Sequence, residues 1–340
     1  MTTTSFPLGK LPADHLARLL AQVSSRSPRV VVGPQVGEDA AVLDMGDRFL
    51  VAKSDPITFA TDQIGWYAVH VNANDVACTG ATPLWFLATL LLPQGRADAV
   101  MVDAIFGQVV GACEEIGVVL VGGHTEITYD LNRPVLVGMM LGEVAPEQLV
   151  TTGGARPGDA VLLTKRIAVE GTAIIAQEKR EELTLCQDIS IEFLDRCVDF
   201  IHHPGISVVP AARIAVETAP IHAMHDPTEG GLATGLWELA TAANVGLEID
   251  AEAVQVYPET QRLCDIYGLD PWGIIGSGSL LLTTADSDAV RVCDALLHAG
   301  IETAVIGRVT SEQAGLTLRV GDAQRPLPAF DRDEIARLFE

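Results

Sequence analysis

The chain has 340 residues, of which 48% are hydrophobic, and a formal net charge of −23 with only four lysines. This length favours two domains, and so acidic a chain repels nucleic acid at long range, which argues against DNA or RNA as a partner. There is no run of about 18 apolar residues and no signal-peptide pattern at the start, so we expect no membrane association and a cytoplasmic location. The six cysteines are scattered without zinc-site spacing and are expected to be free thiols.

The first segments predict a helix over 11–24, a short strand over 29–33, and two more strands over 40–44 and 48–54. Met45-Gly46-Asp47 joins the last two strands and is a hairpin signal. Antiparallel pairing would place Asp39, before the first strand of the hairpin, beside Asp55, at the end of the second. This is the main spatial contact that the local pattern predicts.

Segment 63–78 is predicted to be a helix of unusual composition. Its polar residues His70, Asn72, Asn74 and Asp75 are spread over several faces, whereas a surface helix confines them to one. Asn72 and Asp75 are three residues apart and therefore lie on one face. Polar groups on an otherwise apolar helix indicate a partly buried polar site.

A glycine-rich stretch is predicted to follow a later strand. The pattern indicates a strand over 84–92, a helix over 97–116, a strand over 118–121 that ends in Gly122-Gly123-His124-Thr125-Glu126, and a strand over 133–142. Ligands of α/β proteins gather where strands end, and glycine lets a ligand approach the backbone. Glu126 could bind a metal ion or act as a base. A plain turn at the strand exit is the alternative.

The glycine-rich segment 151–159 marks the predicted boundary between a first domain, 1–150, and a second, 151–340. The second half alternates predicted strands over 160–165, 223–225, 246–249, 279–284, 303–309 and 316–320 with predicted helices over 169–178, 187–201, 208–218 and 288–299 and a further helix that starts within 226–231 and runs to about residue 243. Asp226-Pro227-Thr228-Glu229-Gly230-Gly231 opens one of these helices. Its backbone could bind a phosphate, while Asp226 or Thr228 could cap the helix. The two interpretations are compatible.

Three aspartates are candidate ligands of a magnesium ion. Mg²⁺ takes oxygen ligands, commonly one or two carboxylates together with phosphate oxygens and water. Asp39, Asp55 and Asp75 suit that role, although each could instead be a turn or cap residue. Their grouping on a predicted hairpin and on a helix of mixed polarity favours a metal site.

Five motifs occur in a specific order along the chain. They are Gly37-Glu-Asp-Ala-Ala41, Ser54-Asp55, Asn74-Asp75-Val-Ala77 with Gly80-Ala81-Thr-Pro83, Gly122-Gly123-His124-Thr125, and His225-Asp226-Pro-Thr-Glu-Gly-Gly231. Together they resemble the superfamily of aminoimidazole ribonucleotide synthetase, selenophosphate synthetase, thiamine-monophosphate kinase and the hydrogenase-maturation protein HypE. The resemblance is greatest to HypE-like proteins.

This resemblance implies an α/β (α+β) fold, in which an N-terminal mixed sheet forms a barrel-like core across a homodimer and a C-terminal α/β domain packs on it. It implies ATP in the cleft and magnesium held by Asp39, Asp55 and Asp75. The other implied residues are, for nucleotide binding, Gly37, Asn74, Gly122, Gly123, Thr125 and Asp226, and, for catalysis, Lys10 as a phosphate clamp, His124 and Glu126.

The chain also departs from the HypE pattern. HypE ends in a tail whose cysteine carries a carbamoyl group, whereas the last cysteine here is Cys293. His124 stands where HypE and thiamine-monophosphate kinase usually have Asp, and Glu126 stands where HypE has Lys. The acceptor thiol, one metal ligand and one catalytic group therefore differ.

The sequence is compatible with three alternative functions. The leading hypothesis is a magnesium-dependent enzyme that uses ATP to activate an amide-type or small-molecule oxygen by phosphoryl transfer, acting on a small molecule or a partner protein. The second is hydrogenase maturation by carbamoyl dehydration, with the acceptor cysteine supplied by another protein. The third is a nucleotide-binding regulator that has lost its chemistry.

Overall fold

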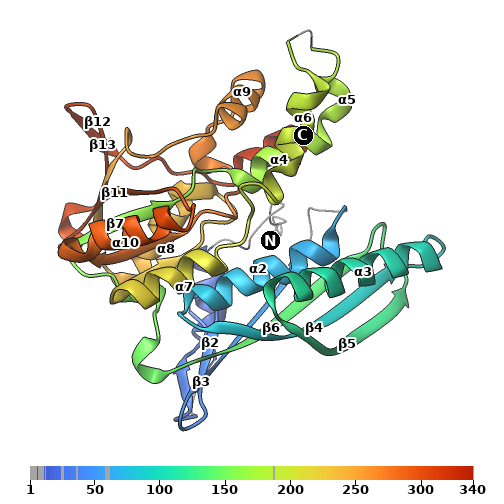
Figure 1. The fold of residues 1–340 in the computed structure, drawn as a ribbon, viewed down its shortest axis with the longest axis horizontal. Helices are drawn as coiled ribbons and strands as arrows, with labels where there is room; N and C mark the ends of the chain where they lie inside the picture. Colours follow the sequence, from blue (N-terminus) through green and yellow to red (C-terminus); the bar gives the residue numbers. More distant parts are fainter. Residues whose placement is uncertain are drawn as a thin grey trace, which may run out of the picture.

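The chain folds into two mixed sheets with helices packed on them, as the computed structural model shows (Figure 1). The structure describes residues 6, 11, 13–23, 27–35, 37–57, 62–186 and 188–339. Lys10, the predicted phosphate clamp, lies outside the described residues. The predicted α/β class is confirmed. No helix in the described ranges is long and apolar enough to cross a membrane.

The N-terminal part forms a six-stranded sheet. Its strand order is β1 (Val30–Val32), β2 (Ala41–Asp44), β3 (Phe49–Ile57), β6 (Val135–Val144), β4 (Thr82–Pro93) and β5 (Val119–Thr128). Helices α2 (Ile64–Cys78) and α3 (Ala99–Ile116) lie together on one face of this sheet (Figure 1). Helix α1 covers Ala13–Leu20, so the helix predicted over 11–24 is shorter than expected.

The predicted hairpin is confirmed, because β2 and β3 pair antiparallel with Ala41 opposite Ala52. Strand β3 continues past the predicted end at residue 54, so Asp55 lies inside a strand that pairs with β6. Aspartate and proline disfavour strands, but the Asn72 side chain accepts a hydrogen bond from the Asp55 N–H (2.8 Å) and donates one to its carbonyl oxygen (3.4 Å). These two hydrogen bonds and the pairing with β6 allow β3 to continue as far as Ile57.

The motif Gly122–Glu126 lies within β5, and the prediction that it follows a strand is wrong. Strand β5 pairs parallel with β4, with Gly123 opposite Ala88. A Cβ on Gly123 would lie 1.9 Å from the Ala88 carbonyl oxygen, and the φ of 149° also favours glycine. The glycine thus permits close strand pairing here, where the sequence pattern predicted the exit of a strand.

The C-terminal part forms a seven-stranded sheet. Its order is β13 (Ala323–Pro326), β12 (Leu316–Val320), β9 (Gly246–Asp250), β11 (Thr303–Thr310), β7 (Asp159–Thr164), β10 (Leu281–Ala285) and β8 (Ile221–His225). Helices α7 (Val209–Thr218) and α10 (Asp286–His298) share one apolar core with β7, β8 and β10, and α8 (Gly231–Ala243) shares another with β7, β9 and β11. Helices α4 (Val169–Glu178), α5 (Arg180–Leu183), α6 (Ile191–Val198) and α9 (Pro258–Tyr267) form a separate group (Figure 1).

Several boundaries in this part differ from the prediction. Helix α9 and strand β13 were not predicted, and the helix predicted over 187–201 is α6 followed by one turn of 3-10 helix, Asp199–Ile201. Helix α8 begins after Gly230, whose φ is 79°, so neither Asp226 nor Thr228 caps it. The further 3-10 turns are Pro146–Gln148, Thr152–Gly154, Pro271–Gly273, Glu312–Ala314 and Glu334–Phe339. The boundary at residue 150 stays a prediction.

Helix α2 connects the two parts of the molecule. Ala77 and Cys78, at its C-terminal end, pack in the same apolar cluster as α7. The fully buried Asn74 donates from its amide to the Ile206 carbonyl oxygen and accepts from the Val208 N–H, both at 2.8 Å. Of the polar residues that made the α2 sequence unusual, Asn74 and Asp75 therefore face this junction, whereas Asn72 bonds to Asp55 of β3.

Candidate active site

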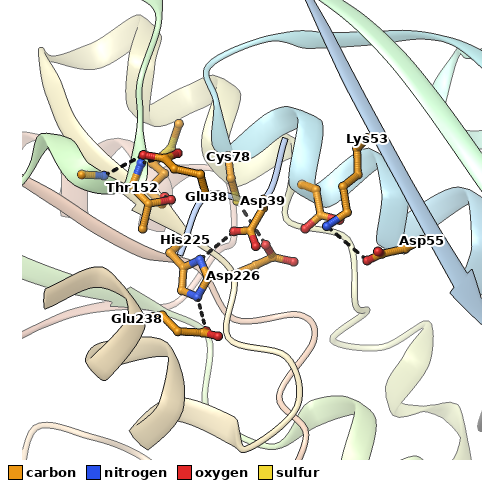
Figure 2. Close-up of polar contacts among 12 residues, drawn as sticks. Glu38, Asp39, Lys53, Asp55, Cys78, Thr152, His225, Asp226 and Glu238 are labelled. Atoms are coloured by element: carbon orange, nitrogen blue, oxygen red, sulfur yellow. Dashed lines mark hydrogen bonds and ion pairs between the residues drawn. The ribbon is translucent and has the colours of Figure 1, made fainter. Parts of the chain in front are cut away.

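Three carboxylates from distant segments meet at the junction. Asp39 precedes β2, Asp75 lies in the last turn of α2, and Asp226 follows β8. One oxygen from each lies within 4.8 Å of the others, and Asp39 and Asp226 face one another in Figure 2. Asp75 and Asp226 are only 3% and 2% exposed. The structure thus joins two predicted metal ligands with Asp226, which was predicted to bind nucleotide.

Burial makes ionisation of this cluster costly. Desolvation, followed by the charge of Asp39, raises the pKa of Asp226 to about 7, and burial also raises the pKa of Asp75 well above its ordinary value. Asp226 Oδ1 accepts a weak hydrogen bond from Cys78 Sγ at 3.5 Å, whereas its buried Oδ2 has no hydrogen-bond partner. Buried, mutually repelling carboxylate oxygens are the ligands a hard divalent cation prefers. The cluster therefore fits Mg²⁺.

Lys53 lies beside the cluster and was not singled out by the sequence analysis. Its Nζ lies 3.1 Å from Asp75 and 3.3 Å from Asp55. Burial alone would lower the pKa of Lys53, but Asp75, Asp55 and Asp39 raise it above its ordinary value, so the ammonium stays charged. Asp55 thus lies beside the three-carboxylate cluster and across Lys53 from it; its role as a metal ligand stays a prediction. The available signal was spacing, since residues 53 and 55 share one face of a strand.

His225 was also missed, and it connects two carboxylates. Its Nδ1 lies 2.8 Å from Asp39 and its Nε2 2.9 Å from Glu238 on α8 (Figure 2). Burial alone would lower the pKa of His225, but Asp39 and Glu238 raise it well above its ordinary value. Both ring nitrogens then donate, and the ring holds the Asp39 carboxylate in a set orientation. The sequence signal was a histidine directly before Asp226.

The segment that carries Asp39 is attached to the C-terminal part. The Glu38 carboxylate accepts from the backbone N–H groups of Gly153 (3.2 Å) and Thr152 (3.4 Å) (Figure 2). Gly37 has a φ of 87°, and a Cβ there would lie 3.2 Å from the Glu238 carbonyl oxygen. Close packing on α8 accounts for this glycine, and its contact with nucleotide stays a prediction.

The remaining predicted residues lie elsewhere. Both ends of the Asn74 amide are engaged by residues 206 and 208, and its contact with the phosphates stays a prediction. His124 and Glu126 are exposed on β5 and 3.3 Å from one another. Gly122, Gly123, His124 and Thr125 line a cavity of about 440 Å³ whose other walls are largely apolar residues of α3, β4 and β6.

Strand pairing gives the distance between the β5 motif and the residues around Lys53 and Asp55. Asp55 pairs with Gly138, Gly138 with Ala88, and Ala88 with Gly123, so these residues form one row across the sheet. Three strand spacings amount to roughly 14 Å. Within one chain, the β5 motif therefore does not touch the residues around Lys53 and Asp55.

Replacing His225 by Asn should weaken magnesium binding by about 10–100-fold, because Asp39 loses the group that orients it. The measurement is Mg²⁺ affinity by calorimetry. His222→Asn is a matched control, because His222 lies in the same strand and contacts Asp159 at 2.9 Å, outside the cluster. Equal affinity for His225→Asn and wild type would remove His225 from the site.

Magnesium should stabilise the protein more at pH 8 than at pH 6. Since the folded pKa of Asp226 is about 7 and its ordinary value is 3.8, the folded state holds protons that the unfolded state releases. Without metal, stability therefore falls as pH rises through this interval. At pH 6 a proton competes with the cation; at pH 8 it does not. The measurement is the Tm with Mg²⁺ and with EDTA at each pH, and a pH-independent difference would contradict the assignment.

The fold and the site define a class: two-part α/β proteins with a buried cluster of three carboxylates at the junction. Within this class, the AIR synthase related protein N-terminal domain matches residues 37–144, and the C-terminal domain of the same family matches residues 156–319. The chain belongs to the AIR synthase related protein family.

Its relatives include HypE proteins. The chain is 33% identical to carbamoyl dehydratase HypE of Cupriavidus necator over 290 residues, 81% of this chain and 78% of that protein. It superposes on the crystal structure of the hydrogenase maturation protein HypE in complex with ATP with a TM-score of 0.72 and 26% identity, covering 95% and 96% of the two chains. A chain of the HypE–HypF complex is similar in fold, with a TM-score of 0.71, 23% identity, and 87% and 93% coverage.

Proposed function

We propose that this HypE-like enzyme binds ATP with magnesium at the cluster of Asp39, Asp75 and Asp226 and activates an amide-type or small-molecule oxygen by phosphoryl transfer. The observation that carries the proposal is the buried three-carboxylate cluster with Lys53 beside it. The solved HypE that resembles this chain is in complex with ATP. Phosphoryl transfer requires mainly positioning and charge neutralisation, and this site provides both.

Each residue of the site would have its own role in binding magnesium and phosphate. Asp39, Asp75 and Asp226 would hold the cation, and His225 would keep Asp39 in place. Lys53 carries a positive charge at the edge of the cluster and would attract phosphate oxygens. When bound, magnesium would supply neutralisation of the phosphate charge. Burial of the cluster excludes water and strengthens each electrostatic contact.

Calorimetry with ATP, in magnesium and in EDTA, tests the proposal. We expect binding in magnesium and none in EDTA, because the acidic cluster repels a polyphosphate without the cation. Absence of ATP binding by the wild type in magnesium would refute it. ATP binding without ADP release across a broad set of amides and small molecules would favour the regulator, a reading supported by the exposure of His124 and Glu126 on β5.

A second candidate function is carbamoyl dehydration on a cysteine of a partner protein. The observation that favours it is the 33% identity to a protein named carbamoyl dehydratase. The direct test is a peptide carrying an S-carbamoyl cysteine, incubated with the protein, magnesium and ATP. Loss of one water from the peptide, read by mass spectrometry, together with ADP release would support this function. An unchanged peptide with ADP release on a small amide would favour the first.

We further propose that the protein is a homodimer whose interface is the open sheet of the N-terminal part. Apolar side chains remain exposed there: Val119 by 58%, Val121 by 52% and Ile127 by 61%, all on β5. Exposed apolar patches on a sheet edge mark association sites. A second copy would cover them and bring the β5 motif of one subunit toward the other.

Val121→Asp should therefore convert the dimer to a monomer, since a charge in an apolar interface is costly. The measurement is mass by light scattering after size exclusion. Val290→Asp is a matched control, because Val290 is 69% exposed on α10 of the C-terminal part. A wild-type protein that is monomeric at about 50 μM would contradict the proposal, since dimers of this kind are stable at that concentration.

A further inference from the structure

A second acidic region, centred on Glu170, lies near the carboxylate cluster. Glu170 is in the first turn of α4 and only 6% exposed. Its Oε2 is buried and has no hydrogen-bond partner. A buried carboxylate is normally paired with a cation or fully hydrogen-bonded, so the Oε2 atom of Glu170 is open to a further partner.

The segments around Glu170 are held together by backbone contacts. The Gly171 N–H donates to the Ile275 carbonyl oxygen (3.1 Å), and the Gly276 N–H donates to the Thr228 carbonyl oxygen (3.2 Å). Asp333 accepts from the Gly230 N–H at 2.7 Å. The start of α4, the loop before α8, the loop before β10 and the segment around residue 333 therefore form a fixed wall, which the sequence alone did not predict.

Several carboxylates of this wall lie close enough to Glu170 to raise its pKa. Burial raises the pKa of Glu170 to about 7; the Ser277 hydroxyl opposes that rise, whereas the charges of Glu229, Asp333 and Asp226 add to it. Burial likewise raises the pKa of Asp333 to about 6. The charge of Glu170 also raises the pKa of Tyr67 in α2, so the acidic region extends to the junction of the two parts. Its negative field attracts a cation.

A metal ion does not account for this arrangement. In the part of the chain that the structure describes, the one set of three acidic, histidine or cysteine ligands compact enough for a metal is Asp39, Asp75 and Asp226. The carboxylates around Glu170 are more widely spaced than that. Ammonium and guanidinium groups are larger and bind carboxylates through several directed N–H donors, and they suit a wider acidic region.

We propose that Glu170, with Glu229 and Asp333, forms a subsite for a cationic nitrogen group, an ammonium or a guanidinium, of the second substrate. The inference rests on the proposed function, because it assigns the substrate class of that same site. Asp226 acts electrostatically on Glu170 and also belongs to the metal cluster. A substrate anchored by its nitrogen at Glu170 would therefore reach the nucleotide with another part of the molecule.

The test uses methylguanidinium and methylammonium as probes, titrated into the full-length protein by NMR, with and without magnesium and a non-hydrolysable ATP analogue. We expect at least one probe to bind wild type and to bind Glu170→Gln about tenfold more weakly, because the charge-assisted hydrogen bond is lost. Glu178→Gln is the matched control, since Glu178 is exposed at the other end of α4. Nucleotide affinity should stay within about twofold in both variants.

Equal probe binding by wild type and Glu170→Gln, or no binding of either probe at about 50 mM, would overturn the subsite. A second readout is the Tm at pH 8. Glu170→Gln should leave it unchanged or raise it by a few degrees, because an unpaired buried charge is removed. A fall of several degrees would show a structural role and would also overturn the proposal. The titration without nucleotide still reports on the subsite if ATP fails to bind, so the two proposals fail separately.

Discussion

Asp75→Asn should weaken magnesium-dependent ATP binding by at least about 100-fold and lower ATP turnover at least as much. Asp75 contributes a buried carboxylate to the three-residue cluster, and an amide has no charge with which to hold a divalent cation. The loss corresponds to about 2.7 kcal/mol of binding free energy. Calorimetry in magnesium, with wild type and variant side by side, measures it.

The fold should survive this substitution. Asn has nearly the shape of Asp, and Lys53 keeps its second partner, Asp55, at 3.3 Å. Burial disfavours the ionised form of Asp75 and the Lys53 ammonium at 3.1 Å favours it, so the two effects oppose one another and the metal-free variant should still fold. Asp103→Asn on the exposed side of α3 is the matched control. An ATP affinity that is unchanged by Asp75→Asn would show that Asp75 does not bind the metal. It would contradict the proposed magnesium site at the three carboxylates.

Asn74→Ala should lower the free energy of unfolding by about 2–5 kcal/mol, the largest stability effect that we expect. The amide of Asn74 satisfies the Ile206 carbonyl oxygen and the Val208 N–H, both at 2.8 Å and both at the junction of the two parts. An unsatisfied buried backbone group costs about 1–3 kcal/mol, and alanine leaves two of them. Urea denaturation followed by circular dichroism measures the change.

The same variant separates two roles of Asn74. The family resemblance implies that Asn74 flanks the phosphates, whereas the structure engages its amide in joining α2 to residues 206–208. Loss of stability would support the joining role. Unchanged stability together with lost ATP binding would support the phosphate role instead. Asn132→Ala, at an exposed position before β6, controls for loss of an amide as such.

The local patterns of the sequence predicted much of the N-terminal part. The turn at residues 45–47 and the alternation around it predicted the hairpin of β2 and β3, and the polar residues on segment 63–78 predicted a helix beside a partly buried polar site. These features depend on neighbours close in sequence. The order of five motifs predicted the family, which the comparisons confirm.

The errors arose where a local signal has two physical causes. Gly122 and Gly123 were placed after the end of a strand, as a ligand-binding stretch or alternatively a plain turn, but both lie within β5, and Gly123 permits the close approach of β5 to Ala88. Asp226 and Thr228 were interpreted as possible caps of α8, but Gly230 takes that position. In the first case the partner that decides the role, Ala88, lies on another strand. In the second, the positive φ of Gly230, two residues after Thr228, sets the start of the helix.

By itself, the sequence determined the class of fold, the family and the aspartates that are candidates for magnesium. Only the tertiary structure brought His225 to Asp39, 186 residues away, set Lys53 between Asp55 and Asp75, and left Glu170 buried beside other carboxylates. The physical reason is that helices, hairpins and motifs depend on short-range spacing, whereas desolvation and charge depend on which distant segments pack together. The electrostatics of the candidate site follow from that packing.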